Sequence, residues 1–392
     1  MTSFLTLVFA TFLARFGYQM ARSPVLPRFA QDLQAPAEVI GLIVAASTIT
    51  GVLIKLPAGA LSDLFGRKRV MLLGCLFFAG PPFLYPFVNS PRQLLALRFL
   101  HGFATALFSP VAAAYIADLA RDVRGERLGW YAAAGDLGGT LGPFLGGMIL
   151  FFVASYPITY VTVGLLGVLP LILVSRLPSE GHHHPESMSF RARTTQLWEG
   201  IREVLLNWSV LIASSLEAVM YLGYGALLGF FPTYGRSIGL NDAEIALIMG
   251  GQLVTTMLAK PVSGRLSDRF GRKPMILTGL MLCAITLPLI PKLIHMWNLA
   301  VTSALFGLGV AIVTPSTTAL VADLARRGRM GSAMGVFGTI WDSGEALGPI
   351  VAGVLIASFS YSYAFSIIAV IMAIVALVFL LSVHEPRFGA AG

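Results

Sequence analysis

Charged residues are scarce in this chain of 392 residues, and that scarcity excludes most classes of soluble protein. Asp, Glu, Lys and Arg make up 12% of the residues, whereas 56% are hydrophobic. A soluble domain has roughly 25% charged residues, so the chain has about half of what a water-facing surface of this size requires. The mean hydropathy of +0.79 agrees. We therefore expect a polytopic membrane protein, and we do not interpret the net charge of +8 as a nucleic-acid-binding surface.

Cysteine is also scarce, which excludes a disulfide framework. Cys75 and Cys283 lie in separate apolar stretches and do not have metal-ligand spacing. A secretory leader is not expected either. The apolar run from Phe4 is longer than the hydrophobic region of a signal peptide, and the basic segment and small-residue cleavage site are missing. The sequence therefore predicts no metal site at the cysteines and no cleaved leader.

Long apolar stretches, separated by short polar breaks, fill almost the whole chain. A membrane span takes about 20 residues, and a helix satisfies all of its own backbone groups in hydrocarbon. Twelve spans leave about 33 residues for each helix and its loop, so no soluble domain fits. The predicted fold is an all-α membrane protein with twelve transmembrane helices. The stretches are 3–27, 38–61, 70–88, 93–116, 128–152, 158–176, 207–231, 243–264, 275–294, 297–320, 333–357 and 361–382.

Basic residues predict which helix ends face the cytoplasm. With the N-terminus placed inside, 18 of the 27 Lys and Arg residues fall in cytoplasmic segments. Four fall in outer segments, namely Arg28, Arg92, Arg236 and Lys292. Because cytoplasmic loops are enriched in Lys and Arg, we expect a multi-pass protein of the cytoplasmic (inner) membrane with both termini in the cytoplasm.

The chain contains an internal repeat with an offset of 205 to 206 residues. Gly59–Lys68, with the sequence GALSDLFGRK, corresponds to Gly264–Lys273, with the sequence GRLSDRFGRK. Each copy occupies the loop after the second helix of its half. Since each half has six helices, an even number, the two repeats run parallel. In transporters built from parallel repeats the substrate binds between the two bundles.

A polar segment divides the chain into two predicted domains. The N-terminal six-helix bundle covers 1–176, a cytoplasmic linker covers 177–206, and the C-terminal bundle covers 207–392. The linker contains a run of three histidines, His182 to His184, without a fourth ligand nearby. We interpret this run as part of a solvated linker rather than as a metal site.

With two copies of the G-x-L-[SA]-D-x-x-G-R-K loop in register, the sequence resembles the major facilitator superfamily over essentially its whole length. Within that family it looks like the drug/proton antiporter group with twelve helices. The resemblance implies two pseudo-symmetric six-helix bundles, the major facilitator fold, in a protein that is not an enzyme and has no catalytic residues. It also implies a monomer that moves a small-molecule substrate, uses protons as its second partner and needs no cofactor beyond a proton gradient.

The duplicated loops resemble latches that hold the cytoplasmic side of such transporters closed. Glycines at the helix ends are expected to let the helices pack closely, and those that follow are expected to allow the tight turn. The alternative is that these loops only fix the orientation of the helices in the membrane and have no role in gating. The predicted latch residues are Gly59, Asp63, Gly66, Arg67 and Asp118 in the first half, and Gly264, Asp268, Gly271, Arg272 and Asp323 in the second.

The fifth predicted helix, 128–152, has a face made of glycine. Gly138, Gly142 and Gly146 recur every four residues, so they line one face and permit close helix packing. Pro143 removes a backbone donor. Together with Gly147, these residues resemble the G-x-x-x-G-P-x-x-G-G signature of the family's antiporters, which is typical of exporters. Packing alone is the alternative reading.

Ionisable residues at membrane depth cost several kcal/mol and are functional candidates by default. The predicted proton-coupling residues are Asp136, Glu217, Asp342, Glu345 and Arg98. Arg98 begins an R-x-x-x-G-x-x-A run that resembles the family's pattern linked to proton transfer. A structural ion pair is the alternative for each acid, and Arg15–Asp136 is the expected pair. Two further basic residues, Lys55 and Lys260, are expected to extend from the helix ends toward water.

The predicted substrate cavity combines polar and aromatic residues. Arg15, Gln19 and Arg22 follow one face of the first helix, at i, i+4 and i+7. Many drug exporters of the family have an acid in this helix, so these arginines predict anionic or zwitterionic amphiphiles rather than lipophilic cations. The full set of cavity residues is Arg15, Tyr18, Gln19, Arg22, Tyr221, Tyr224 and Trp341.

These observations predict a secondary active transporter, namely proton-coupled export of small amphiphilic organic molecules or drugs by alternating access. A facilitator, an importer or a lipid flippase of the same fold is the alternative. An intramembrane aspartyl protease using Asp136 and Asp342 is disfavoured, because Ala-Ala-Gly precedes Asp136 where that chemistry uses Gly-x-Gly. The duplicated loops would also remain unexplained.

Overall fold

The regular structure in the described part of the chain is helical. A computed structural model describes residues 2–119, 124–178, 208–324 and 330–382, so most of the predicted linker and its histidines lie outside the described residues. The helices are α1 (Thr2–Arg22), α2 (Val25–Asp32), α3 (Ala37–Phe65), α4 (Arg67–Ala79), η1 (Pro81–Phe87), α5 (Pro91–Leu119), α6 (Arg124–Val153), α7 (Tyr156–Ser175), α9 (Trp208–Ser237), α10 (Asp242–Phe270), α11 (Arg272–Thr286), η2 (Leu287–Lys292), α12 (Met296–Leu324), α13 (Met330–Ser358) and α14 (Tyr361–Ser382).

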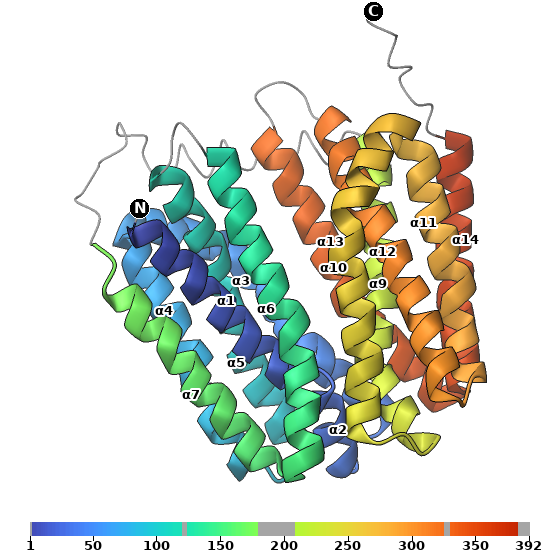
Figure 1. Ribbon diagram of the computed structural model, residues 1–392, viewed down its shortest axis with the longest axis horizontal. Helices are drawn as coiled ribbons and strands as arrows, with labels where there is room; N and C mark the ends of the chain where they lie inside the picture. Colours follow the sequence, from blue (N-terminus) through green and yellow to red (C-terminus); the bar gives the residue numbers. More distant parts are fainter. Residues whose placement is uncertain (1, 120–123, 179–207, 325–329, 383–392) are drawn as a thin grey trace, which may run out of the picture.

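Two helical bundles stand side by side (Figure 1), the first built from α1–α7 and the second from α9–α14. The described residues contain twelve helical segments that are long and apolar enough to cross a membrane. Helices of the second bundle begin 205 residues after their mates, at 242 for α10 against 37 for α3 and at 296 for α12 against 91 for α5. The predicted two-bundle, twelve-helix fold is confirmed.

The start of α1 and the end of α14 lie on the same side of the molecule, at the top of Figure 1. We call this side, where α1 begins and α14 ends, the inner side, and the opposite one the outer side. The names follow the predicted orientation. The bundles are close together at the outer side and diverge toward the inner side (Figure 1).

Glycine allows the tight turn of each duplicated loop. Gly66 and Gly271 have φ angles of 89° and 97°, a region that strongly favours glycine, and each separates two helices of its bundle. The expected close packing at Gly59 and Gly264 was wrong for this conformation. A Cβ at Gly59 would meet no described atom within 4 Å, and one at Gly264 would lie 3.9 Å from Pro315. The reason is that the bundles diverge at this end.

The glycine face of α6 is a seam against α1 within the first bundle. A Cβ at Gly138, Gly142 or Gly146 would lie 2.5 Å from the carbonyl oxygens of Phe12, Phe16 and Met20 in turn. Such distances are far below van der Waals contact. The backbones of α1 and α6 therefore touch along three successive turns, as small-residue faces allow in membranes.

A methyl group in this seam is expected to destabilise the fold. Gly142→Ala should lower the free energy of unfolding by about 1–3 kcal/mol, because the added carbon must displace the backbone of α1. Gly129→Ala is the matched control, since a Cβ at Gly129 of the same helix would meet no described atom within 4 Å. The thermal midpoint of the purified protein in detergent measures both. Equal midpoints for the two variants would contradict a tight seam.

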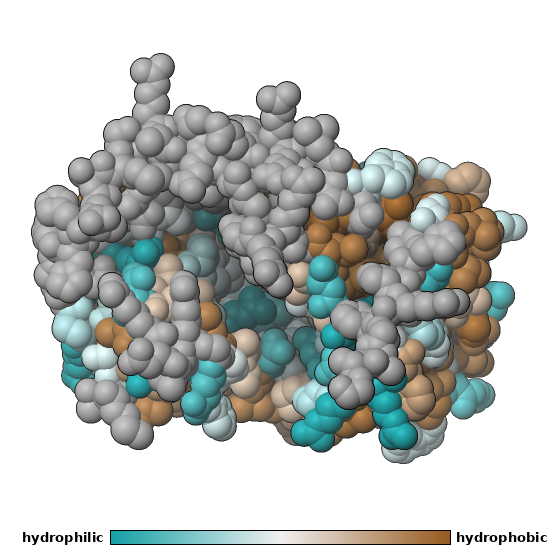
Figure 2. All heavy atoms as spheres, turned by 90° about the horizontal axis from the view of Figure 1, so that it is seen from above, coloured by the Kyte–Doolittle hydropathy of each residue, from teal (hydrophilic) through white to brown (hydrophobic). Residues whose placement is uncertain are grey.

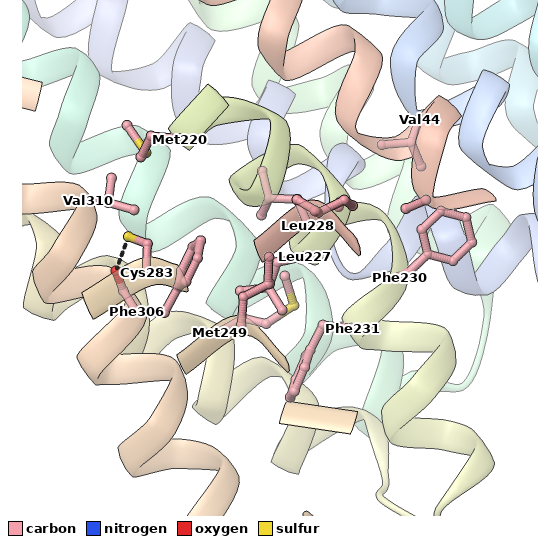
Figure 3. Packing of buried hydrophobic residues seen from close by; sticks show 14 of the residues in the cluster. Val44, Met220, Leu227, Leu228, Phe230, Phe231, Met249, Cys283, Phe306 and Val310 are labelled. Carbon is pink, nitrogen blue, oxygen red and sulfur yellow. Dashed lines mark hydrogen bonds between the residues drawn. The ribbon is translucent and has the colours of Figure 1, made fainter. Parts of the chain in front are cut away.

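An apolar core runs through the second bundle and extends into the outer part of the first bundle. Figure 3 shows its centre, where Leu227 and Phe231 of α9 pack with Met249 of α10. Val44 of α3 belongs to the same cluster although it comes from the first bundle. Since Val44 is buried, with 2% of its surface exposed, the two bundles share a sealed core on the outer side.

Candidate functional site

A cavity of about 260 Å³ lies between the bundles. In the view from the inner side (Figure 2), the surface between the bundles is hollowed and hydrophilic residues lie at its floor. Four helices of the first bundle and α13 of the second form its wall. The lining residues are Thr11, Arg15, Tyr18, Arg22, Ser47, Thr48, Gly51, Lys55, Thr105, Ser109, Tyr131, Ala132, Gly135, Asp136, Asp342 and Glu345.

Close backbone packing separates this cavity from the outer side. A Cβ at Gly353 of α13 would lie 2.6 Å from the carbonyl oxygen of Ala37, and one at Gly41 of α3 would collide with the carbonyl of Pro349. On the other side of the interface, a Cβ at Gly147 of α6 would collide with Ala246 of α10. Gly147, which belongs to the predicted antiporter motif but not to its glycine face, thus packs against the opposite bundle. The cavity opens on the inner side.

Ion pairs reinforce this outer closure. Arg28 of α2 is buried and pairs with Asp242 at the start of α10. Asp32 of α2 pairs with Arg236 of α9 at 3.2 Å and accepts a hydrogen bond of 2.6 Å from the hydroxyl of Tyr156. Both ion pairs join the first bundle to the second. The sequence analysis had treated Arg28 and Arg236 only as outer-loop charges.

Ion pairs also cross between the bundles at the depth of the cavity. Lys55 of α3 pairs with Asp342 of α13 at 2.5 Å. Lys260 of α10 pairs with Asp136 of α6 at 3.4 Å. These two pairs are related by the internal repeat, since the lysines are 205 residues apart and the aspartates 206. Each half therefore supplies one lysine and one aspartate to the other half.

Lys55 and Lys260, which were expected to extend toward water, keep 39% and 30% of their side chains exposed, but their ammonium groups bind acids of the facing bundle. Each lies ten residues before the inner end of its helix, at Phe65 and Phe270, which is about 15 Å along the axis. Each ammonium group reaches across the interface to a carboxylate of the facing bundle. The repeat itself contained the signal, because both lysines precede the duplicated loop by the same distance.

A third cross-bundle pair lies deeper in the structure. Arg22 at the end of α1 binds Glu345 of α13 at 2.5 Å and donates a further hydrogen bond of 3.2 Å to the hydroxyl of Thr48. The side chains of Arg22 and Glu345 are only 11% and 12% exposed. With this pair, α13 contributes two acids to the cavity and both bind basic residues of the first bundle.

Arg15 does not form the ion pair expected from the sequence. Arg15 and Asp136 both line the cavity, but Asp136 pairs with Lys260. Among the described residues, no carboxylate lies within 4.0 Å of the Arg15 guanidinium. The rotation of α6 that brings Gly138 against α1 aims Asp136 at the second bundle instead.

Arg98 lies inside the first bundle, behind the cavity wall. It is fully buried, and its guanidinium stands 4.9 Å from the ring centre of Tyr18, which lines the cavity. Its Nη1 lies 3.5 Å from Nδ1 of His101, whereas Nε and Nη2 have no hydrogen-bond partner among the described atoms. His101 Nδ1 also lies 3.2 Å from the hydroxyl of Tyr85. Arg98 is thus a buried cation surrounded by aromatic rings.

Glu217 differs from the other three predicted proton-coupling acids. It lies inside the second bundle on α9 with no exposed surface, and it accepts a short hydrogen bond from the Thr317 hydroxyl of α12. Its Oε1 has no partner, and the described residues place no basic group within ion-pair distance. The other acids, Asp136, Asp342 and Glu345, each bind a cation across the interface.

The remaining predicted cavity residues do not belong to the described lining. Tyr221 stacks on Trp341 with ring centres 5.3 Å apart, and Tyr224 meets Tyr221 edge to face at 5.5 Å. These rings form an aromatic cluster between α9 and α13. Gln19 packs instead against α6, where its Cβ would lie 3.1 Å from a Cβ at Gly142. Of the seven predicted residues, Arg15, Tyr18 and Arg22 line the cavity.

Arg67 and Arg272 of the duplicated loops each pair with an acid of their own bundle. Arg67 pairs with Asp118 at 2.6 Å, and its repeat mate Arg272 pairs with Asp268 at 2.5 Å and with Asp323 at 3.4 Å. The side chain of Asp63 lies outside the described part of the structure. These contacts join helix ends within each bundle. A latch between the bundles remains a prediction.

No group of three His, Cys, Asp or Glu side chains within residues 2–119, 124–178, 208–324 and 330–382 could hold a metal ion. The two cysteines are buried and free.

Comparison with known proteins agrees with this architecture. The family model described as Major Facilitator Superfamily matches residues 7–221 and 213–391. Multidrug resistance protein 1 of Bacillus subtilis is 27% identical over 338 residues, covering 85% of this chain and 84% of its own length. Quinolone resistance protein NorA of Staphylococcus aureus (strain MRSA252) is 26% identical over 340 residues, with the same coverage of 85% and 84%.

A solved structure supports the fold independently of sequence. The crystal structure of the nucleoside transporter NupG superposes with a TM-score of 0.77 over 96% of this chain and 99% of that chain. The two sequences are 14% identical, so this likeness concerns the fold alone.

Proposed function

Because the chain belongs to the Major Facilitator Superfamily, we propose that it exports small amphiphilic organic molecules in exchange for protons. The proposal depends on one observation, the cavity between the bundles, whose two walls are joined by ion pairs at membrane depth. Two relatives that match 85% of this chain are named for resistance to drugs, which supports organic compounds as substrates. The proposal includes a monomer that needs no cofactor beyond the proton gradient.

The way the bundles meet supports transport by alternating access. The main contacts between them are α3 with α13 and α6 with α10. In this conformation the outer parts of these helices touch and the inner parts diverge (Figure 1). Rocking one bundle against the other would exchange the closed end for the open end around a fixed central site. An inner-open cavity, on the side predicted to be cytoplasmic, is the state in which an exporter takes up its substrate.

Glu217 is our first assignment for the proton. An unpaired charge at membrane depth is costly, and the described surroundings of Glu217 offer a hydroxyl group but no cation. A bound proton removes that charge. The other predicted acids, whose charges are balanced by basic residues of the facing bundle, instead hold the bundles together in the inner-open state.

Transport in liposomes tests this function. The purified protein is reconstituted, a pH gradient is imposed, and labelled lipophilic cations, organic anions and lysolipids are screened for movement. The assay is repeated with Asp136→Asn, Glu217→Gln, Asp342→Asn and Glu345→Gln. We expect the pH gradient to drive one class of compound against its concentration gradient, and at least one variant to lose that drive.

Other outcomes would identify the alternatives. Movement that is equal with and without the gradient, in the wild type and in all four variants, would indicate a facilitator and end the proton-exchange proposal. Accumulation that moves in the same direction as the proton would indicate an importer. Selective movement of lysolipids between leaflets would indicate a flippase.

A further inference from the structure

The charges around the cavity do not balance. Its described lining includes three acids, and each of them binds one cation, so that Glu345, Asp342 and Asp136 are neutralised by Arg22, Lys55 and Lys260. Two cations of the first bundle remain. They are Arg15, which lines the cavity, and Arg98, which lies behind Tyr18 in the wall. The first-bundle side of the cavity therefore has uncompensated positive charge.

Tyr18 links these two cations to the same part of the cavity. Arg15 and Tyr18 are three residues apart on α1, so their side chains lie on neighbouring positions of one helix face. Both line the cavity. Arg98, which is fully buried and not part of the lining, stands 4.9 Å from the centre of the Tyr18 ring. A negative group beside Arg15 and Tyr18 would thus be attracted by both guanidinium groups.

The wall of α6 next to Arg15 leaves room for such a group. Ala132 and Gly135 line the cavity there and have no side-chain atoms beyond Cβ. A Cβ at Gly135 would lie 3.8 Å from Cγ of Arg15, and one at Gly139 would lie 3.9 Å from its Nη2. The guanidinium therefore faces open space and small residues rather than a packed acid.

We propose that the cavity binds an organic anion, with its carboxylate, sulfonate or phosphate group held by Arg15 beside Tyr18 and attracted by Arg98. The proposal rests on the transport function above and names the class of its substrate. An unpaired guanidinium at membrane depth is costly, and a bound anion supplies the missing partner through charge-assisted hydrogen bonds.

Binding without a pH gradient tests this inference. The purified full-length protein in detergent micelles is dialysed to equilibrium against three probes of similar shape, with empty micelles subtracted. The probes are 2-naphthalenesulfonate, 2-naphthylmethanol and 2-naphthyltrimethylammonium. We expect the sulfonate to bind more tightly than the ammonium probe by at least about tenfold. Arg15→Gln should weaken sulfonate binding by a similar factor, whereas Arg15→Lys should retain most of it.

Arg92→Gln serves as the matched control for net charge, because Arg92 is exposed at the start of α5 and outside the cavity. It should leave all three affinities within about twofold of the wild type. The inference is overturned if the ammonium probe binds as tightly as the sulfonate, if no probe binds, or if folded Arg15→Gln retains wild-type sulfonate affinity. Should Arg15→Gln fail to fold, the order in which the wild type binds the three probes tests the inference.

The binding and transport results are separable. Preferential sulfonate binding without gradient-driven transport would refute proton exchange and leave the anion site standing. Gradient-driven transport of lipophilic cations, without sulfonate binding, would refute the anion site and leave proton exchange standing.

Discussion

Glu217→Gln is expected to weaken accumulation driven by the pH gradient strongly and to leave the protein folded. Glutamine cannot take up or release the proton, but its side-chain oxygen can still accept the hydrogen bond that Thr317 donates. Because the site is fully buried, the near-equal size of the two side chains preserves its packing. We expect the gradient-driven component of transport to fall by a factor on the order of 5–150, the usual range of coupling between two sites.

Three measurements make this result interpretable. Transport of the compound identified in the liposome screen is compared with and without the gradient, the affinity for that compound is measured in detergent, and the thermal midpoint reports folding. Glu126→Gln is the matched control, since it makes the same chemical change at an exposed position near the inner end of α6. It should behave as the wild type.

A different outcome would assign proton coupling to another residue. If Glu217→Gln retained gradient-driven transport while Asp136→Asn or Asp342→Asn lost it, the cross-bundle ion pairs rather than the isolated acid would mediate coupling. Neutralising the acid of a buried ion pair should also lower stability, because it leaves an uncompensated buried cation. Glu345→Gln, which leaves Arg22 buried without a carboxylate, is expected to lower the thermal midpoint where Glu217→Gln does not.

Gly41→Ala is expected to shift the protein away from the inner-open conformation. The added methyl group would collide with the backbone carbonyl of Pro349, which cannot rotate away as a side chain would. Overpacking of this kind costs about 1–3 kcal/mol, and it acts only on the state in which α3 and α13 touch. The inner-open population should therefore fall by roughly 5–150-fold relative to the alternative state, and exchange should slow.

Distances between bundles measure this shift directly. Spin labels at Trp130 of α6 and Phe270 of α10, both exposed near the inner side, report how far the inner ends stand apart. We expect shorter distances in Gly41→Ala than in the wild type. Gly51→Ala is the control on the same helix, because a Cβ there would meet only the end of the Lys55 side chain at 3.5 Å.

If Gly41→Ala and Gly51→Ala gave the same distances and the same exchange rate, the contact between Gly41 and Pro349 would not stabilise the inner-open conformation. A second variant, on α13, tests whether the effect of Gly41→Ala comes from the interface rather than from a local distortion of α3. Gly353→Ala places its methyl group against the carbonyl of Ala37 from the other helix and should produce the same shift.

The sequence was enough to predict the membrane fold. The fold follows from hydrophobic composition, the spacing of the apolar stretches and the repeat at 205 residues. These features depend on local pattern and on duplication, which can be identified from the sequence alone. The spacing of Gly138, Gly142 and Gly146 likewise predicted a packing face, and that face contacts α1. A period of four residues defines one face of a helix whatever lies opposite it.

Only the tertiary structure decided how the charged residues combine. Lys55 and Asp342 are 287 residues apart, Arg22 and Glu345 are 323 apart, and Asp136 and Lys260 are 124 apart. Which acid meets which base depends on the rotation of each helix and on the angle between two bundles, and neither is encoded in local spacing. The same geometry left Arg15 and Glu217 without ion-pair partners among the described residues. The scarce charges were visible in the sequence, but the difference between paired and unpaired ones arose where the bundles meet.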